Sequence, residues 1–172
     1  MIIIIGTRPD RKEQLQNCTS SISSEFPYIT VDCDGYEIGK IKWALEHTNF
    51  DEFVFLQDST EIKDNNLFNK LKNTRRSVSF NNCPSLFGSY LGKYKRSVLE
   101  QMTLPLIRDK LGSVDYECKF GREYAQIDPP LVLFPEFKDG DNFVEKWGNK
   151  KMMKIENKYL IKYKSIWCKE QL

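Results

Sequence analysis

The chain has 172 residues, of which 29% are charged and 40% hydrophobic, and its formal net charge is +2. These values are typical of one soluble globular domain, and the net charge is too small to indicate a partner. No stretch approaches the ~20 apolar residues that a membrane span needs. The apolar run Ile2–Ile5 is too short for the core of a signal peptide.

The cysteines and the single histidine restrict the compartment and the chemistry. The odd number of cysteines and the lack of a C-x-x-C pair indicate free thiols in a reducing compartment, so we expect a cytoplasmic protein. Because His47 is the only histidine of the sequence, a histidine-rich zinc site is excluded, and a Ser-His-Asp triad would have to use His47. Its place near the end of a predicted helix favours a surface role. The cysteines are Cys18, Cys33, Cys83, Cys118 and Cys168.

The first half of the chain alternates three times between a predicted strand and a predicted helix. Runs of β-branched and aromatic residues predict the strands, and apolar residues three or four positions apart predict the helices. This alternation with short connections predicts a parallel α/β sheet with right-handed crossovers. We expect strands at Ile2–Ile5, Tyr28–Val31 and Phe53–Leu56, and helices at residues 11–24, at 38–48 and after Asp64.

The second half predicts shorter elements and a basic C-terminal tail. Residues 143–172 carry eight lysines against three glutamates, interleaved with two tryptophans and two tyrosines. We expect strands at Ser77–Phe80, Ser85–Leu91 and Leu131–Phe134, a helix over Lys93–Met102, and a second helix from Asp115 to Tyr124.

The stretch Phe53–Glu61 organises the functional prediction, because an apolar strand runs directly into a polar cluster. Open α/β sheets bind ligands at the carboxyl ends of their strands. Phe53–Glu61 resembles the third strand of GT-A-fold glycosyltransferases, which ends in an Asp-x-Asp motif that holds a divalent metal and a nucleotide-sugar pyrophosphate. In this sequence Thr60 stands where the second Asp would be. In a continuous strand Asp58 and Thr60 would share one face.

The resemblance implies a single GT-A-like (Rossmann-like) α/β domain over residues 1–172, with a mixed, mostly parallel sheet flanked by helices. Residues 1–80 would be the nucleotide-binding half, 81–142 the acceptor half, and 143–172 the basic tail. Asp58 would be the ligand of Mn²⁺ or Mg²⁺, and the Thr60 departure leaves metal dependence open. The implied donor-binding residues are Thr7, Arg8, Arg11, Asp32, Asp34, Lys40, Gln57, Asp58, Ser59, Thr60, Gly88 and Lys162.

The resemblance also implies a carboxylate that deprotonates the acceptor hydroxyl. Asp115 is the first candidate and Glu117 the second, and Arg122 fits the same family pattern. The alternative is structural, because Asp115 is also a natural N-cap for the predicted helix.

The implied function is transfer of a sugar from a nucleotide-diphosphate sugar to an acceptor hydroxyl. Two alternatives stay open: a nucleotidyltransferase, although Gly6–Arg11 lacks the expected glycines, and a non-catalytic nucleotide-, sugar- or nucleic-acid-binding protein that has lost a carboxylate. The basic tail is either a solvated face, a source of a lysine such as Lys162 for the diphosphate, or a surface for a polyanionic acceptor such as DNA with a modified base. We favour the diphosphate role, since the glutamates dilute the charge.

Overall fold

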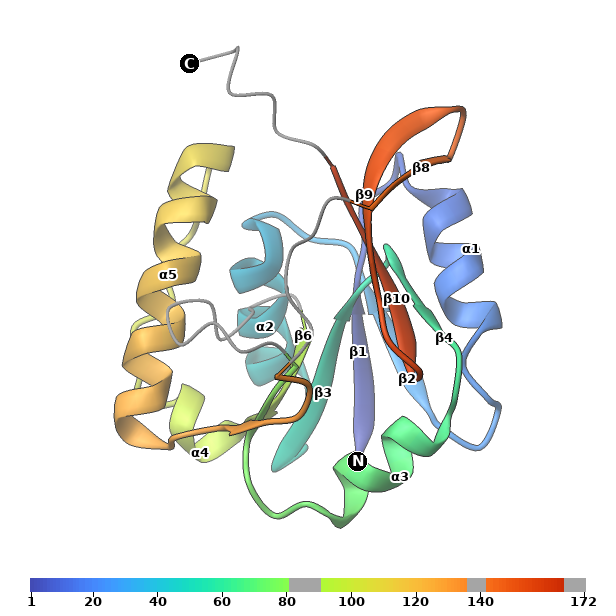
Figure 1. Ribbon diagram of the computed structural model, residues 1–172. Helices are drawn as coiled ribbons and strands as arrows, with labels where there is room; N and C mark the ends of the chain where they lie inside the picture. The colour runs from blue at the N-terminus through green and yellow to red at the C-terminus, as the bar shows by residue number, and fades with distance from the viewer. Residues whose placement is uncertain (81–90, 136–141, 166–172) are drawn as a thin grey trace.

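The computed structural model describes residues 1–80, 91–135 and 142–165. It contains two β-sheets with helices packed around them (Figure 1). The strands of the larger sheet are β1 (Ile2–Gly6), β2 (Tyr28–Val31), β3 (Glu52–Gln57), β5 (Val78–Ser79), β6 (Leu91–Lys95) and β7 (Leu131–Val132). The helices are α1 (Lys12–Ser20), α2 (Tyr36–His47), α3 (Asn66–Asn73), α4 (Arg96–Leu99) and α5 (Lys110–Ile127).

The larger sheet is mixed and mostly parallel, with the strand order β2-β1-β3-β6-β5-β7. β1 pairs in parallel with both β2 and β3, and β5 pairs in parallel with β7. β6 is antiparallel to β3 on one side and to β5 on the other. The other strands therefore share one direction, and the α/β class with a mostly parallel sheet is confirmed.

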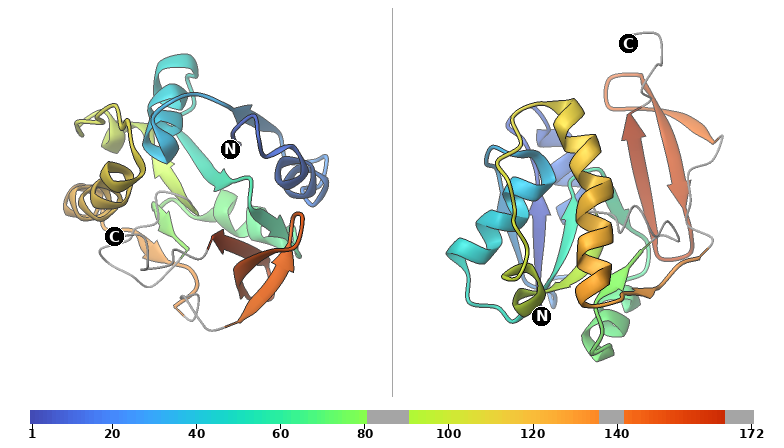
Figure 2. Two further views of the ribbon diagram at one scale, coloured as in Figure 1. Left: turned by 90° about the horizontal axis from the view of Figure 1, so that it is seen from above. Right: turned by 90° about the vertical axis from the view of Figure 1, so that its left-hand side faces the viewer.

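Alternate residues of the central strands build two apolar cores, one on each face of the sheet. Ile3 and Ile5 of β1 pack with side chains of α1 and α3, whereas Ile2 and Ile4 pack with those of α2, α4 and α5. β3 continues both cores because its apolar residues point to both faces and are fully buried. Seen from above, α1 lies on one side of the sheet and α2 and α5 lie on the other (Figure 2).

The smaller sheet corrects the expectation of a basic tail. It consists of β4 (Thr60–Ile62), β10 (Leu160–Ser165), β9 (Lys150–Glu156) and β8 (Phe143–Lys146), in that order, all antiparallel. β4 follows β3 after a turn at residues 58–59. Leu160 and Ile155 join the α1/α3 core. Residues 142–165 therefore pack against residues 1–80 and extend beside the main sheet (Figure 2).

The predicted helix over Lys93–Met102 is wrong in its first three residues. Leu91–Lys95 is strand β6, and only the four residues of α4 follow as helix. β6 is central in the sheet, so Lys93 and Tyr94 are both fully buried. The Lys93 ammonium is neutralised by Glu52 at 2.8 Å. This ion pair lets a charged residue lie buried in a central strand. Most of the predicted strand Ser85–Leu91, and Gly88 with it, lies outside the described residues.

The predicted start of the following helix at Asp115 is also wrong. α5 begins at Lys110, and Asp109 is its N-cap, with a side chain that accepts a hydrogen bond from the Gly112 amide at 2.8 Å. Asp115 is consequently an exposed residue inside the helix. No helix among the described residues is long and apolar enough to cross a membrane.

Candidate functional site

Two adjoining cavities lie at the carboxyl ends of β1, β2 and β3, where α2 begins. The narrow cavity has a volume of about 70 Å³ and the wide one about 590 Å³, and Arg8, Tyr36 and Lys40 line both. Of the predicted donor-binding residues, the narrow cavity is lined by Thr7, Arg8, Arg11, Lys40 and Gln57, and the wide cavity by Arg8, Asp32, Asp34 and Lys40. The structure thus brings the strand-end residues together as predicted.

Gly6 allows Lys40 to cover the end of β1. A Cβ atom on Gly6 would lie 2.7 Å from Cδ of Lys40 and 2.8 Å from Cζ of Phe55. The Lys40 side chain is nearly buried, and its ammonium donates hydrogen bonds to the carbonyls of Cys33 at 3.1 Å and Tyr36 at 3.2 Å. Lys40 therefore fixes the loop between β2 and α2, and its positive charge stays at the wall shared by both cavities.

The start of α2 is built from two unusual backbone positions. Gly35 has φ 91° and Tyr36 has φ 55°, so a left-handed turn leads into the helix. A Cβ on Gly39 would lie only 2.0 Å from the Asp34 carbonyl oxygen, so the loop also needs glycine inside the helix. This compact turn leaves Asp32 and Asp34 exposed at the rim of the wide cavity.

Asp58 is buried and forms an ion pair with Arg11. It is only 1% exposed, and Nη1 of Arg11 lies 3.1 Å from its Oδ1. Its Oδ2 accepts a hydrogen bond from the Thr7 hydroxyl at 3.0 Å. Thr7 and Arg11 belong to the loop after β1, so Asp58 ties that loop to the end of β3. A buried carboxylate needs such partners, because an unpaired charge in the interior is strongly unfavourable.

The side chains around Asp58 do not fit a divalent metal ion. Both carboxylate oxygens already accept hydrogen bonds from Arg11 and Thr7. The expectation that Asp58 and Thr60 share one strand is wrong, because β3 ends at Gln57 and Thr60 opens β4 after a turn. The Thr60 hydroxyl is buried and has no hydrogen-bond partner among the described residues.

Lys162 lines neither cavity, but it forms a hydrogen bond with Gln57, which lines the narrow one. It lies on β10 opposite Thr60, is 2% exposed, and donates to Oε1 of Gln57 at 2.5 Å and to the Ser59 hydroxyl. Burial lowers the pKa of Lys162 to about 7, although the nearby Asp58 opposes this effect. The lysine that we expected to close over a diphosphate instead supports the pocket from the smaller sheet.

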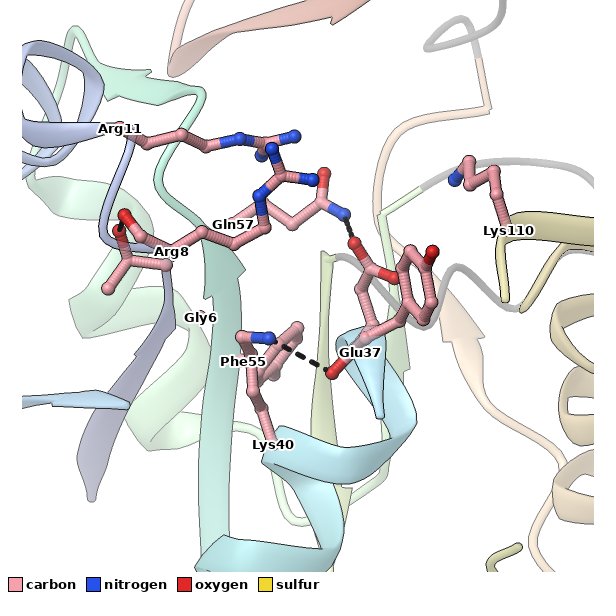
Figure 3. A pocket seen from close by; sticks show the side chains of 10 residues that line it. Gly6, Arg8, Arg11, Glu37, Lys40, Phe55, Gln57 and Lys110 are labelled. Atoms are coloured by element: carbon pink, nitrogen blue, oxygen red, sulfur yellow. Dashed lines mark hydrogen bonds between the residues drawn. The ribbon is translucent and has the colours of Figure 1, made fainter. Parts of the chain in front are cut away.

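Gln57 also contacts Glu37 at the start of α2. The Gln57 amide donates a hydrogen bond to Oε1 of Glu37, which Figure 3 shows as a dashed line. Oε2 of Glu37 is buried and has no hydrogen-bond partner among the described residues. Glu37 thus presents an acceptor whose second oxygen remains available for a donor group.

Glu117, and not Asp115, faces this acidic group. Burial raises the pKa of Glu117 to about 7, with the charge of Glu37 as the next cause. The Ser113 hydroxyl, one turn earlier, donates to it at 3.4 Å. Residues two positions apart lie on opposite sides of a helix, and Asp115 is exposed. Asp115 and Glu117 therefore lie on different sides of α5, and neither of them lines the two cavities.

The sequence did not single out three residues that line the narrow cavity. Tyr36 and Glu37 open a helix directly after a strand-end loop, a position that can be recognised from sequence in α/β sheets. Lys110 comes from α5, on the other side of the pocket (Figure 3). Only tertiary packing brings Lys110 there, so no local pattern could have identified it.

The comparisons with known proteins support the fold alone. No family model and no curated protein matches the chain. Among solved structures, the crystal structure of A197 from STIV is similar to it, with a TM-score of 0.51 and 10% sequence identity over 100% of both chains. The chain therefore shares a mixed α/β architecture with A197 from STIV over its whole length.

Proposed function

We propose that this protein is a glycosyltransferase that moves a sugar from a nucleotide-diphosphate sugar to an acceptor hydroxyl. One observation carries the proposal: a narrow cavity lined by four cationic side chains adjoins a nucleoside-sized cavity at the carboxyl ends of parallel strands. The four cations are Arg8, Arg11, Lys40 and Lys110. Ligand sites of α/β sheets are found at this edge, which also supports the assignment.

The two cavities suit the two parts of such a donor. The wide cavity, at about 590 Å³, lies within the usual range of small-molecule sites. Its rim carboxylates, Asp32 and Asp34, would accept hydrogen bonds from ribose hydroxyls or a base. Arg8 and Arg11 both line the narrow cavity, and arginine suits phosphate oxygens because its donors form a planar fork.

Glu117 is the proposed general base. A base works best when its pKa lies near the working pH, and the pKa of Glu117 is raised to about 7. In the proposed step Glu117 takes the acceptor proton while the acceptor oxygen bonds to the anomeric carbon. The bond from that carbon to the diphosphate oxygen breaks, and the departing diphosphate keeps the electron pair. The free oxygen of Glu37 would accept a hydrogen bond from a sugar or acceptor hydroxyl.

A non-catalytic binder is the second candidate, because Thr60 replaces the second carboxylate of the resembled motif. The same cavities would then hold a nucleotide without turnover. A nucleotidyltransferase uses a related pocket but lacks support here, since the loop Gly6–Arg11 contains one glycine only.

A thermal-shift screen tests donor recognition. The ligands are nucleoside diphosphates, their sugar derivatives and nucleoside triphosphates, each with and without Mn²⁺. A ligand at 100 times its dissociation constant stabilises the folded protein by about 2.7 kcal/mol, which is readily measured. We expect one nucleoside-diphosphate class to stabilise the protein. Preference for triphosphates would favour the nucleotidyltransferase, and no stabilisation by any of them would contradict the proposal.

A further inference from the structure

We infer that Arg11, held in place by Asp58, binds the donor diphosphate directly, and that the site recognises this group without a divalent metal. The inference rests on the proposed function and deepens it, because it names the group that carries the leaving charge. It departs from the metal site that the resemblance implies, and it makes Asp58 a positioning residue.

Arg11 is placed to use both ends of its guanidinium group. Nη1 lies 3.1 Å from the Asp58 carboxylate, which is fully buried, whereas the Arg11 side chain is 31% exposed and lines the narrow cavity. A guanidinium group has five N–H donors, and the Asp58 contact leaves others available to the cavity. Asp58 therefore fixes the orientation of a side chain that is otherwise flexible.

The residues around Asp58 favour its pairing with the Arg11 guanidinium group over its binding a metal ion. A metal at Asp58 would have to displace Arg11 and Thr7 from its two oxygens. It would also lie near the buried ammonium of Lys162, whose charge interacts with Asp58. A second carboxylate is missing at Thr60. The repulsion and the shortage of oxygen ligands both oppose metal binding at this point.

The charged side chains that line the narrow cavity are mainly positive. Among the described residues, four cationic side chains line this cavity and Glu37 is the single acidic one. Arg8 is also oriented by an acid, since it forms two hydrogen bonds with Asp10 at 3.0 and 2.6 Å. The positive charges of Arg8, Arg11, Lys40 and Lys110 can together neutralise the negative charge of a diphosphate. In metal-dependent sites a bound metal ion does this instead.

Calorimetric titration of the full chain tests this inference. The probes are inorganic pyrophosphate, UDP and GDP, each in EDTA and with Mn²⁺ in excess over the probe. The variants are Arg11→Lys, Asp58→Asn and the double variant Arg11→Ala/Asp58→Asn, which avoids leaving Asp58 buried without its cation. Arg75→Ala is the control, since Arg75 is exposed before β5, at the opposite edge of the sheet.

We expect the wild-type protein to bind pyrophosphate and one nucleoside diphosphate equally well in EDTA and Mn²⁺. The double variant should lose about tenfold or more in affinity, as expected for a charge-assisted hydrogen bond, without rescue by Mn²⁺. Arg11→Lys should also bind more weakly because it lacks the planar fork. Asp58→Asn should weaken metal-free binding, but less than the double variant does, because the neutral amide oxygen can still accept a hydrogen bond from Arg11 without the ion pair. Arg75→Ala should match the wild-type protein.

The other outcomes separate this inference from the proposed function. Nucleotide binding that requires Mn²⁺ and disappears in Asp58→Asn overturns the inference and leaves the function standing. Metal-free pyrophosphate binding that depends on Arg11, with no tighter binding of any nucleoside diphosphate, supports the anion site and contradicts the function. No binding of any probe under either condition overturns both.

Discussion

Lys162 of β10 donates a hydrogen bond to the side-chain carbonyl of Gln57, the last residue of β3, at 2.5 Å. These residues are far apart in the chain, and their contact joins the smaller sheet to the edge of the candidate site. Gln57 in turn donates to Glu37, so one polar chain runs from β10 to the start of α2. The smaller sheet is thereby part of the site's support.

Replacing Lys162 should change how stability depends on pH. Burial lowers the pKa of Lys162 to about 7 from the ordinary value of 10.5. Between these values the unfolded chain binds more protons than the folded protein, so the wild-type free energy of unfolding should rise with pH relative to Lys162→Met. The expected gain is a few kcal/mol.

Urea denaturation at pH 6 and pH 9 measures this difference. Lys150→Met, on the exposed part of β9, controls for the loss of one positive charge. A wild-type minus Lys162→Met difference that stays constant across the two pH values would show that the buried ammonium does not titrate there.

Glu117→Gln should reduce turnover on the order of 10²-fold or more, with donor binding retained, because the acceptor proton has no base. The wild-type rate should rise with pH to a plateau, with a midpoint near the Glu117 pKa of about 7. Asp115→Asn is the matched control on the same helix. If Asp115→Asn loses the activity and Glu117→Gln keeps it, the assignment of the base is wrong.

The same glutamate gives a test that needs no substrate. The pKa of Glu117 is raised from 4.5 to about 7 in the folded protein, so its stabilising contribution is complete below pH 4.5 and is lost as pH rises through 7. Glu117→Gln should therefore gain stability relative to the wild-type protein between pH 5 and pH 8. Parallel denaturation curves that show no such gain would contradict the burial of this carboxyl.

Gly6→Ala should weaken both the fold and the site. The new methyl group would collide with Lys40 and with Phe55, and Phe55 is fully buried. Overpacking of this kind costs about 1–3 kcal/mol, and displacement of Lys40 should lower nucleotide affinity. Gly112→Ala is the control, since its Cβ would meet no atom closer than 3.4 Å. Equal melting temperatures for Gly6→Ala and the wild-type protein would contradict the close packing described here.

The lysines of the smaller sheet should not bind duplex DNA strongly. Several are neutralised within the protein: Lys146 lies 2.9 Å from Glu61, and Lys154 lies 2.9 Å from Glu156. Contacts to several phosphates would make affinity fall steeply with salt, at a slope of about −0.9 per phosphate in a log–log plot. A gel-shift titration at rising salt measures this slope. Micromolar binding with a slope of several units would instead favour a DNA acceptor.

The first half of the fold was predictable because its signals are local. The apolar runs of β1, β2 and β3 and the spacing in α1 and α2 indicated strand, helix and direction without tertiary information. β6 was missed because the burial of Lys93 depends on Glu52 across the sheet. The smaller sheet was missed because its strands alternate lysines with apolar residues that become buried only against β4 and the main core.

The site was predictable to the same extent. Strand-end residues such as Thr7, Arg11 and Gln57 do line one cavity, since parallel strands end at one edge. Which of Asp115 and Glu117 is exposed depends on the phase of α5, and that phase follows from the cap at Asp109. The pairing of Asp58 with Arg11 could not be predicted from the sequence, because two helices and two strands separate these residues in the chain.

Donor cleavage tests the central claim most directly. The nucleotide sugar that most stabilises the protein is incubated without acceptor, and release of nucleoside diphosphate is followed by chromatography for the wild-type protein and for Glu117→Gln. We predict slow release by the wild-type protein, as water replaces the acceptor, and a much smaller rate for Glu117→Gln. A donor that binds to the wild-type protein and stays intact through prolonged incubation would contradict the glycosyltransferase and identify a non-catalytic binder.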